Sequence, residues 1–236
     1  MPNKLKPNKK WIKTFLHGFI PSKYAFLTFL IFYFAGFIFA YVAPHLAQSN
    51  FNGGFLLGEL DAKIQVPQTI TLVYLENQFI HYLGAVSWGL FVNNMRTSFL
   101  CIFSGIAIVP VVLISLFSSL GAVTYLLILK VGIFKAFLII FGSFHLYFEV
   151  LAAMLVIDAF LKFYGSFLIS IREGSTRRFK NEVIYGVLPI LLSIIVLLAV
   201  AAVLEVFWST WWVYILTHSH VSWQNFYLGL YSCIVR

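Results

Sequence analysis

The chain has 236 residues, of which 61% are hydrophobic and only 10% are charged, and its mean hydropathy is +0.92. A soluble domain of this length needs more polar residues to cover its surface, whereas helices that face lipid are apolar all round. The composition excludes an ordinary water-soluble protein and predicts an all-α, polytopic bundle of transmembrane helices.

The formal net charge of +8 does not indicate a nucleic-acid-binding protein, because the basic residues flank apolar runs and form no extended basic face. One cluster, at the amino terminus, consists of Lys4, Lys6, Lys9, Lys10 and Lys13. The other follows the fourth predicted span and consists of Lys162, Arg172, Arg177, Arg178 and Lys180. The positive-inside rule places both in the cytoplasm. We therefore expect a multi-pass protein of the cell membrane with a cytoplasmic amino terminus.

The hydropathy pattern predicts one integral membrane domain, 1–236, with about six spans and one interfacial amphipathic helix at 68–78. An exterior loop is expected at 44–67 and a cytoplasmic basic loop at 164–186. The expected spans are 24–43, 79–109, 111–129, 137–163, 187–207 and 221–235. The last run has only 15 residues, which suits either a span through thin membrane or an interfacial helix, and we favour the span.

Charged side chains inside the predicted spans are the strongest functional signal. Each costs about 2.5 to 3.5 kcal/mol at the bilayer centre even on the lenient insertion scale, so each needs a partner or a wet cavity. On a helix, His145 and Glu149 share a face because they stand four residues apart. Asp158 faces Lys162, which predicts a snorkelling pair near the cytoplasmic end of the span.

Two interpretations of the His145 and Glu149 pair remain open. A carboxylate beside an imidazole can bind a proton or a cation. Alternatively, the pair belongs to a buried polar cluster that fixes the helix register. We hypothesise that Arg96 neutralises Glu149 or Glu205 inside such a cluster. Its predicted members are Asn93, Asn94, Arg96, His145, Glu149 and Glu205.

The sequence carries no common signature of metal or hydrolytic chemistry. Cys101 and Cys233 form no CxxC pair, and the histidines lack the spacing of a structural zinc site. No Gly-rich phosphate loop, GxSxG elbow or HExxH sequence is present. These observations identify no cofactor or metal and favour a protein that is not an enzyme.

Three short motifs give the chain a family resemblance. They are Asn93-Asn94-Met95-Arg96 followed by Phe103 and Gly105, then His145-Leu146-Tyr147-Phe148-Glu149 followed by Leu151-Ala152-Ala153, and then Ala201-Ala202-Val203-Leu204-Glu205-Val206-Phe207. In their order and spacing, roughly from Phe79 to Thr210, they resemble the stage II sporulation protein M family. The resemblance implies a polytopic membrane protein that, in endospore formers, works with envelope partners in peptidoglycan remodelling during engulfment.

The leading hypothesis is a membrane scaffold or assembly factor that recruits envelope-associated partners. The main alternative is a transporter or channel for protons, ions or a small solute, with a pathway lined by Arg96, His145, Glu149 and Glu205 and a broken helix between Gly105 and Pro110. An intramembrane enzyme using His145 and Glu149 is a third hypothesis. We expect membrane lipids as partners and no nucleic acid, and we leave open other membrane or envelope proteins and an oligomer.

Overall fold

A computed structural model of the chain describes residues 15–49, 72–105, 109–217 and 221–227. Within these residues every regular element is a helix, as the composition predicts. The principal elements are α2 (Lys23–Val42), α4 (Leu72–Phe103), α5 (Val109–Val131), α6 (Ile133–Gly142), α7 (Phe144–Glu173), α8 (Arg177–Glu182), η1 (Val183–Val187), α9 (Leu188–Leu204), η2 (Glu205–Ser209) and α10 (Thr210–Thr217). Elements η1 and η2 are π-helical turns.

Three helices in the described part of the chain are long and apolar enough to cross a membrane. They are α2, α7 and the continuous helix Arg177–Thr217, which joins α8, η1, α9, η2 and α10. The chain is therefore an integral membrane protein, and the count of about six spans stays a prediction. Part of four predicted segments lies outside the described residues, namely 50–67 of the exterior loop, 68–71 of the interfacial helix, 106–108 of the second span and 228–235 of the last span.

The helix bounds differ from the sequence prediction in three places. The described part of the interfacial segment, from residue 72, continues into α4 as one helix that ends at Phe103. The expected helix 137–163 is two helices, α6 and α7, divided at Ser143. The expected loop 164–186 is mostly helical, because α7 continues to Glu173 and α8 begins at Arg177.

The turn between α7 and α8 is short because Gly174 adopts φ 62°, a left-handed conformation that favours glycine. The N–H of Ser175 donates to the Ser170 carbonyl at 3.1 Å, and the N–H of Gly174 donates to the Ile171 carbonyl at 3.2 Å. This pair of bonds is a Schellman motif, which satisfies carbonyls at the end of a helix. A helical hairpin therefore stands where an open loop was expected.

The division at Ser143 is held by indoles from the last helix. The Trp208 side chain donates to the Gly142 carbonyl at 2.8 Å, and Trp212 donates to the Leu138 carbonyl at 3.0 Å. A Cβ on Gly142 would overlap the Trp212 ring. Trp208 and Trp212 thus fix the corner between α6 and α7.

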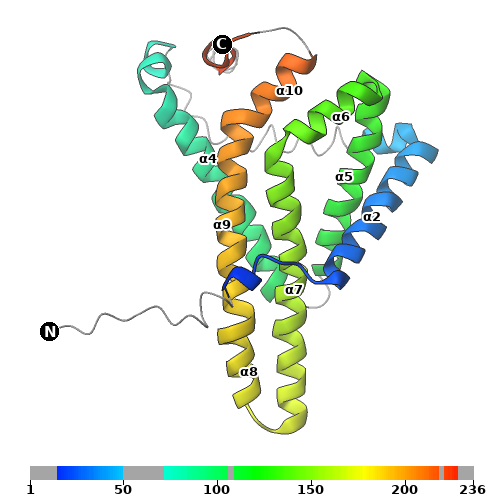
Figure 1. Cartoon of the computed structure of the whole chain (residues 1–236), viewed down its shortest axis with the longest axis vertical. Helices are drawn as coiled ribbons and strands as arrows, with labels where there is room; N and C mark the ends of the chain where they lie inside the picture. Colours follow the sequence, from blue (N-terminus) through cyan, green and yellow to red (C-terminus); the bar gives the residue numbers. More distant parts are fainter. Residues whose placement is uncertain (1–14, 50–71, 106–108, 218–220, 228–236) are drawn as a thin grey trace, which may run out of the picture.

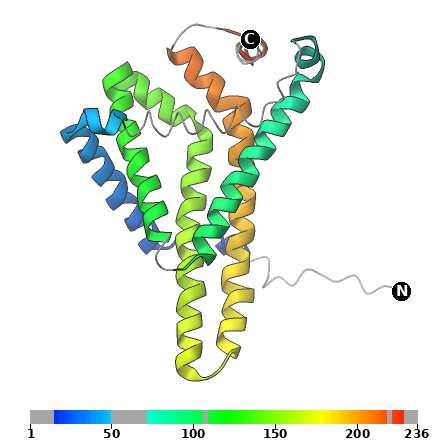
Figure 2. The same ribbon diagram turned by 180° about the vertical axis from the view of Figure 1, so that it is seen from behind.

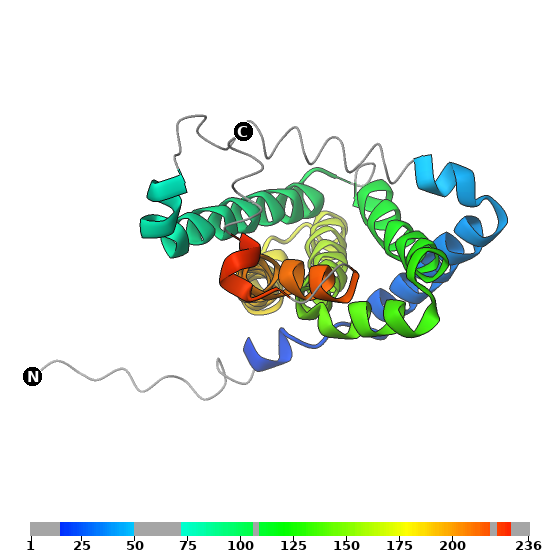
Figure 3. The ribbon, with the colours of Figure 1, turned by 90° about the horizontal axis from the view of Figure 1, so that it is seen from above.

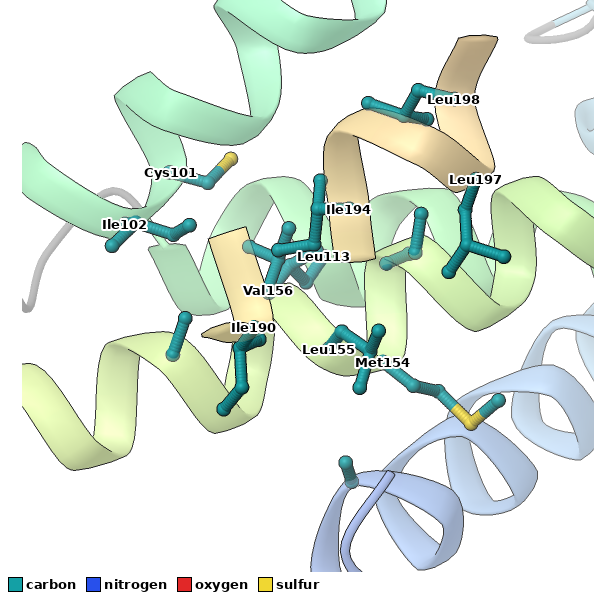
Figure 4. Packing of buried hydrophobic residues seen from close by; sticks show 14 of the residues in the cluster. Cys101, Ile102, Leu113, Met154, Leu155, Val156, Ile190, Ile194, Leu197 and Leu198 are labelled. Atoms are coloured by element: carbon teal, nitrogen blue, oxygen red, sulfur yellow. The ribbon is translucent and has the colours of Figure 1, made fainter. Parts of the chain in front are cut away.

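The core lies between α7 and α9, which pack side by side at the centre of the bundle (Figure 1). Buried Leu155 and Val156 of α7 meet Ile190, Ile194 and Leu197 of α9. Figure 4 shows α4 adding Cys101 and Ile102 to this cluster, and Met154 extending towards α2. From behind, α4 crosses this pair obliquely (Figure 2). Leu113 and Phe117 of α5 also belong to this cluster, so the core joins five helices.

Helices α2 and α5 form a second, outer pair beside the central one (Figure 3). Both glycines at their contact are buried. A Cβ on Gly36 would overlap the Ser118 carbonyl, and one on Gly121 would overlap the Tyr33 carbonyl. Small residues let membrane helices approach through their backbones. Away from this contact α2 exposes large apolar side chains, such as Ile31 and Phe34, as a lipid-facing helix does.

Candidate functional site

Two predicted motif residues meet between α4 and α7. The Asn94 side-chain amide donates to Glu149 Oε1 at 3.1 Å. Both side chains are half-buried, so the bond gives a carboxylate inside the bundle a polar partner from another helix. A buried charge is tolerated in a membrane only with such compensation. The NNxR and HxxxE motifs are therefore joined through Asn94 and Glu149.

A cavity of about 160 Å³ adjoins this pair. Its polar wall comes from Glu149 and from three α4 residues on one helical face, Asn94, Thr97 and Ser98. Its apolar wall includes Leu116 of α5 and Leu198 of α9. The volume is sufficient for water or a small solute. Carboxylate, amide and hydroxyl groups in one cavity can bind a cation or a hydrogen-bonding molecule.

His145 of the second motif contacts the turn η2, which begins inside the third motif. The Nδ1 atom of His145 lies 2.7 Å from Ser209 Oγ, at the end of η2. Element η2 is a π-helical turn, and such turns often occur at functional sites because they change which side chains share a face. Glu205 begins this turn and interacts electrostatically with Glu149. Three motifs from α4, α7 and η2 therefore gather on one side of the central pair.

The structure overturns the predicted role of Arg96. Its side chain is exposed, and within the described residues it forms no ion pair or hydrogen bond with Glu149 or Glu205. Asn93 is exposed too, and only its carbonyl is used, as the acceptor for Thr97 Oγ1 at 3.0 Å. The reason is helical geometry, because residues 93 and 96 share a face that points away from the face of Asn94 and Ser98.

Asp158 does not pair with Lys162, as the spacing had predicted. Its carboxylate is buried and accepts two hydrogen bonds from Ser22, one from the backbone N–H at 2.6 Å and one from the hydroxyl at 2.5 Å. The Ser22 hydroxyl also accepts from the N–H of Ala25 at 3.2 Å and caps α2. Asp158 therefore joins α7 to the N-cap of α2.

Sequence reasoning missed three groups of contacting residues. For Ser22 the sequence carried a signal of its role, since a serine directly before an apolar run is a preferred helix N-cap. Thr97 and Ser98 also had one, because they lie three and four residues after Asn94. Ser209 had none, because its approach to His145 depends on the π-turn. Among the described residues, no group of three histidine, cysteine, aspartate or glutamate side chains can hold a metal ion.

A sequence profile described as Stage II sporulation protein M matches residues 24–210, which is more than half of the chain. The chain belongs to the stage II sporulation protein M family. This confirms the resemblance read from the three motifs, all of which lie inside the matched range. No curated protein and no solved structure gave a significant match. Family membership and three apolar helices together identify an integral membrane protein, and the contacts above show how the motif residues connect its helices.

Proposed function

We propose that this member of the stage II sporulation protein M family is a membrane scaffold, which recruits envelope-associated partners through the hairpin formed by α7 and α8. The observation that carries the proposal is the projection of this hairpin beyond the ends of α2, α4 and α5 (Figure 1). We further propose that the hairpin is cytoplasmic, on the same side as the amino terminus, because its basic residues follow the positive-inside rule.

The length of the projection follows from one contact. Asp158 of α7 binds Ser22, which caps the start of α2, so these two residues mark the same level in the bundle. Helix α7 continues to Glu173, which lies 15 residues further on, or about 22 Å at the helical rise of 1.5 Å per residue. A hairpin of this length reaches past the membrane surface, where a partner can contact it.

The surface of the hairpin suits a protein partner. Arg172, Arg177 and Lys180 are exposed, and Leu168 and Ile171 expose 57% and 63% of their surface beside them. Arg178 is engaged locally by Glu173 at 2.9 Å. Exposed apolar side chains edged by charged groups are typical of interaction surfaces. By contrast, Asn94 and His145 are engaged in contacts between helices, which supports a structural role for the motif cluster.

A photo-crosslinking residue at position 168 tests the proposal in native membranes, with position 34 on the exposed face of α2 as the comparison. We expect a protein adduct at position 168 and lipid adducts at position 34. The double variant R172Q/K180Q should weaken the protein adduct at least about tenfold, since interface charges contribute strongly to recognition. The matched control K130Q/K135Q removes two exposed charges from the connection between α5 and α6 and should leave the adduct unchanged.

Equal adduct yields in the two double variants, at equal membrane levels, would contradict recruitment through the hairpin. Orientation is tested separately by thiol labelling of a cysteine placed at Ser175 in intact cells. We expect labelling only after the membrane is permeabilised. Labelling of intact cells would place the hairpin outside and end the cytoplasmic assignment.

The cavity beside Glu149 supports a second candidate function, the passage of protons, cations or a small solute. Its polar wall includes Asn94 and Glu149, which belong to two of the three motifs, and a binding site in a membrane transporter requires such polar groups. A flux assay in liposomes under a proton or sodium gradient separates the two functions. The scaffold proposal expects no flux that depends on Glu149, whereas flux lost in Glu149→Gln and kept in Arg96→Gln would favour transport.

A further inference from the structure

A second cavity, of about 350 Å³, lies beside the middle of α7 and shares no lining residue with the cavity beside Glu149. Residues 17–24, the middle of α7 and the start of the last long helix enclose it. None of its lining residues belongs to a family motif. Its polar lining consists of His17, Ser22, Tyr24, Asp158, Lys162 and Tyr185. This cavity is independent of both functions proposed above.

One wall of this cavity is built by a tight turn before α2. The N–H groups of Gly18 and Ile20 donate to the carbonyls of Phe15 and His17, at 2.9 and 3.2 Å. A Cβ on Gly18 would lie only 2.9 Å from Ser193 Oγ and 3.0 Å from the Pro189 carbonyl. The turn is therefore packed tightly against α9, and the wall that carries His17 has a defined position.

The opposite wall is shaped by the π-turn η1. The N–H of Leu188 donates to the Val183 carbonyl, five residues back, which widens the helix locally. Tyr185 and Gly186 of this turn line the cavity, and the Glu182 side chain lies against Gly186. The widened turn thus brings a phenol group and an open stretch of backbone to the cavity.

The charges in the cavity favour a singly charged anion. The side chains of Lys162 and His17 are exposed and, within the described residues, form no hydrogen bond or ion pair. Lys23 adds a further positive charge nearby, with its Nζ 5.2 Å from the centre of the Tyr24 ring. Asp158 is already bonded twice by Ser22, and Glu182 lies beside the wall. These two carboxylates disfavour a doubly charged anion more than a singly charged one.

The position of the cavity suits a lipid. Ser22, which lines it, is the N-cap of the first membrane-spanning helix, so the cavity lies where the span meets the membrane surface. Ile20 and Leu161 also line it and expose 65% and 50% of their surface. Apolar side chains beside cationic and phenolic groups match a molecule with acyl chains and a phosphate head group.

We propose that this cavity binds the phosphodiester head group of a membrane phospholipid. Lys162 and His17 hold the phosphate, the hydroxyls of Tyr24 and Tyr185 donate to its oxygens, and the acyl chains lie along Ile20 and Leu161. A phosphodiester carries one negative charge, whereas inorganic phosphate at neutral pH is partly doubly charged. The neighbouring carboxylates therefore select the lipid over free phosphate.

Native mass spectrometry of the full chain in detergent, after delipidation, tests the proposal. The probes are phosphatidylglycerol, chain-matched diacylglycerol and inorganic phosphate. We expect saturable binding of phosphatidylglycerol and much weaker binding of diacylglycerol, which lacks the phosphate. Lys162→Met should weaken phosphatidylglycerol binding roughly tenfold, as expected when a charge-assisted hydrogen bond is lost. Adding His17→Ala should weaken it further.

The matched control is Lys130→Met, an exposed lysine on α5 that lies outside the cavity. It should bind phosphatidylglycerol like the wild type. Both lysines are exposed, so both variants are expected to fold, which equal thermal unfolding in detergent verifies. Equal lipid binding by the two lysine variants, or equal binding of diacylglycerol and phosphatidylglycerol by the wild type, would overturn the proposal. Full competition by inorganic phosphate at equal concentration would show a soluble-anion site and also overturn it.

Discussion

Two contacts between helices in this protein are built from different kinds of residue. The contact of α2 with α5 has glycines at its centre, with the Cα of Gly36 against the Ser118 carbonyl. The contact of α4 and η2 with α7 instead uses polar side chains, Asn94 with Glu149 and His145 with Ser209, and leaves a cavity beside them. The first relies mainly on close packing, beside a hydrogen bond from the Tyr33 hydroxyl to Thr124 Oγ1 at 3.0 Å, and the second relies on hydrogen bonds.

The difference between the two contacts indicates which of them the family motifs form. The motif residues Asn94, His145 and Glu149 make polar contacts that belong to the second contact, whereas Gly36 and Gly121 belong to none of the three motifs. Close packing can use any pair of small residues at the right spacing. A polar contact needs particular groups at particular positions, so its residues form a recognisable sequence pattern. The following predictions test this comparison.

The largest effect is expected at the glycine contact. Gly36→Leu should lower the free energy of unfolding by about 3 kcal/mol or more, because the added side chain meets backbone that cannot move aside. Unfolding of the purified protein in increasing SDS, followed by tryptophan fluorescence, measures this. The control is Gly84→Leu, since a Cβ at Gly84 meets nothing within 4 Å. Equal destabilisation by both variants would show that α2 and α5 do not pack as described.

Substitutions in the polar contact should cost less free energy of unfolding, and the cost should depend on which group replaces the carboxylate. Glu149→Leu leaves the Asn94 amide without its acceptor and should cost about 1 to 3 kcal/mol, whereas Glu149→Gln keeps an acceptor oxygen and should cost less. A double-mutant cycle with Asn94→Leu and Glu149→Leu, measured in the same SDS unfolding assay, should give a coupling of about 1 kcal/mol. Additive effects of the two substitutions would contradict the bond.

Helix α2 also has a polar contact with α7, at the beginning of α2. Ser22→Ala removes the cap of this helix and one of the two bonds to Asp158, so we expect a loss of about 1 kcal/mol. Thr28→Ala is the control, because its hydroxyl bonds only to the Tyr24 carbonyl of its own helix. If thermal unfolding in detergent is equally affected by both substitutions, Ser22 does not connect α2 to α7.

The smallest effect is expected at Arg96, although it belongs to the same motif as Asn94. Arg96→Gln should change the free energy of unfolding by less than about 0.5 kcal/mol, as exposed positions without partners usually do. The SDS unfolding assay again measures the change. A loss comparable to that of Glu149→Leu, together with coupling to Glu149, would restore the ion pair expected from the sequence.

The sequence alone determined the class of protein and its family. An excess of apolar residues requires lipid as the solvent, and the three motifs are local patterns that can be read without a fold. The first span was placed within one residue at each end, since 24–43 compares with Lys23–Val42. Apolar length and flanking charges were sufficient there.

Only the tertiary structure decided which polar groups meet. Asp158 binds Ser22, which is 136 residues away, instead of Lys162 one turn along the same helix. Glu149 takes Asn94 as its partner instead of the oppositely charged Arg96. Both choices depend on how each helix is rotated against its neighbours. Helices that are apolar on every face carry little periodic signal of that rotation, so local spacing identified the polar residues and the packing chose their partners.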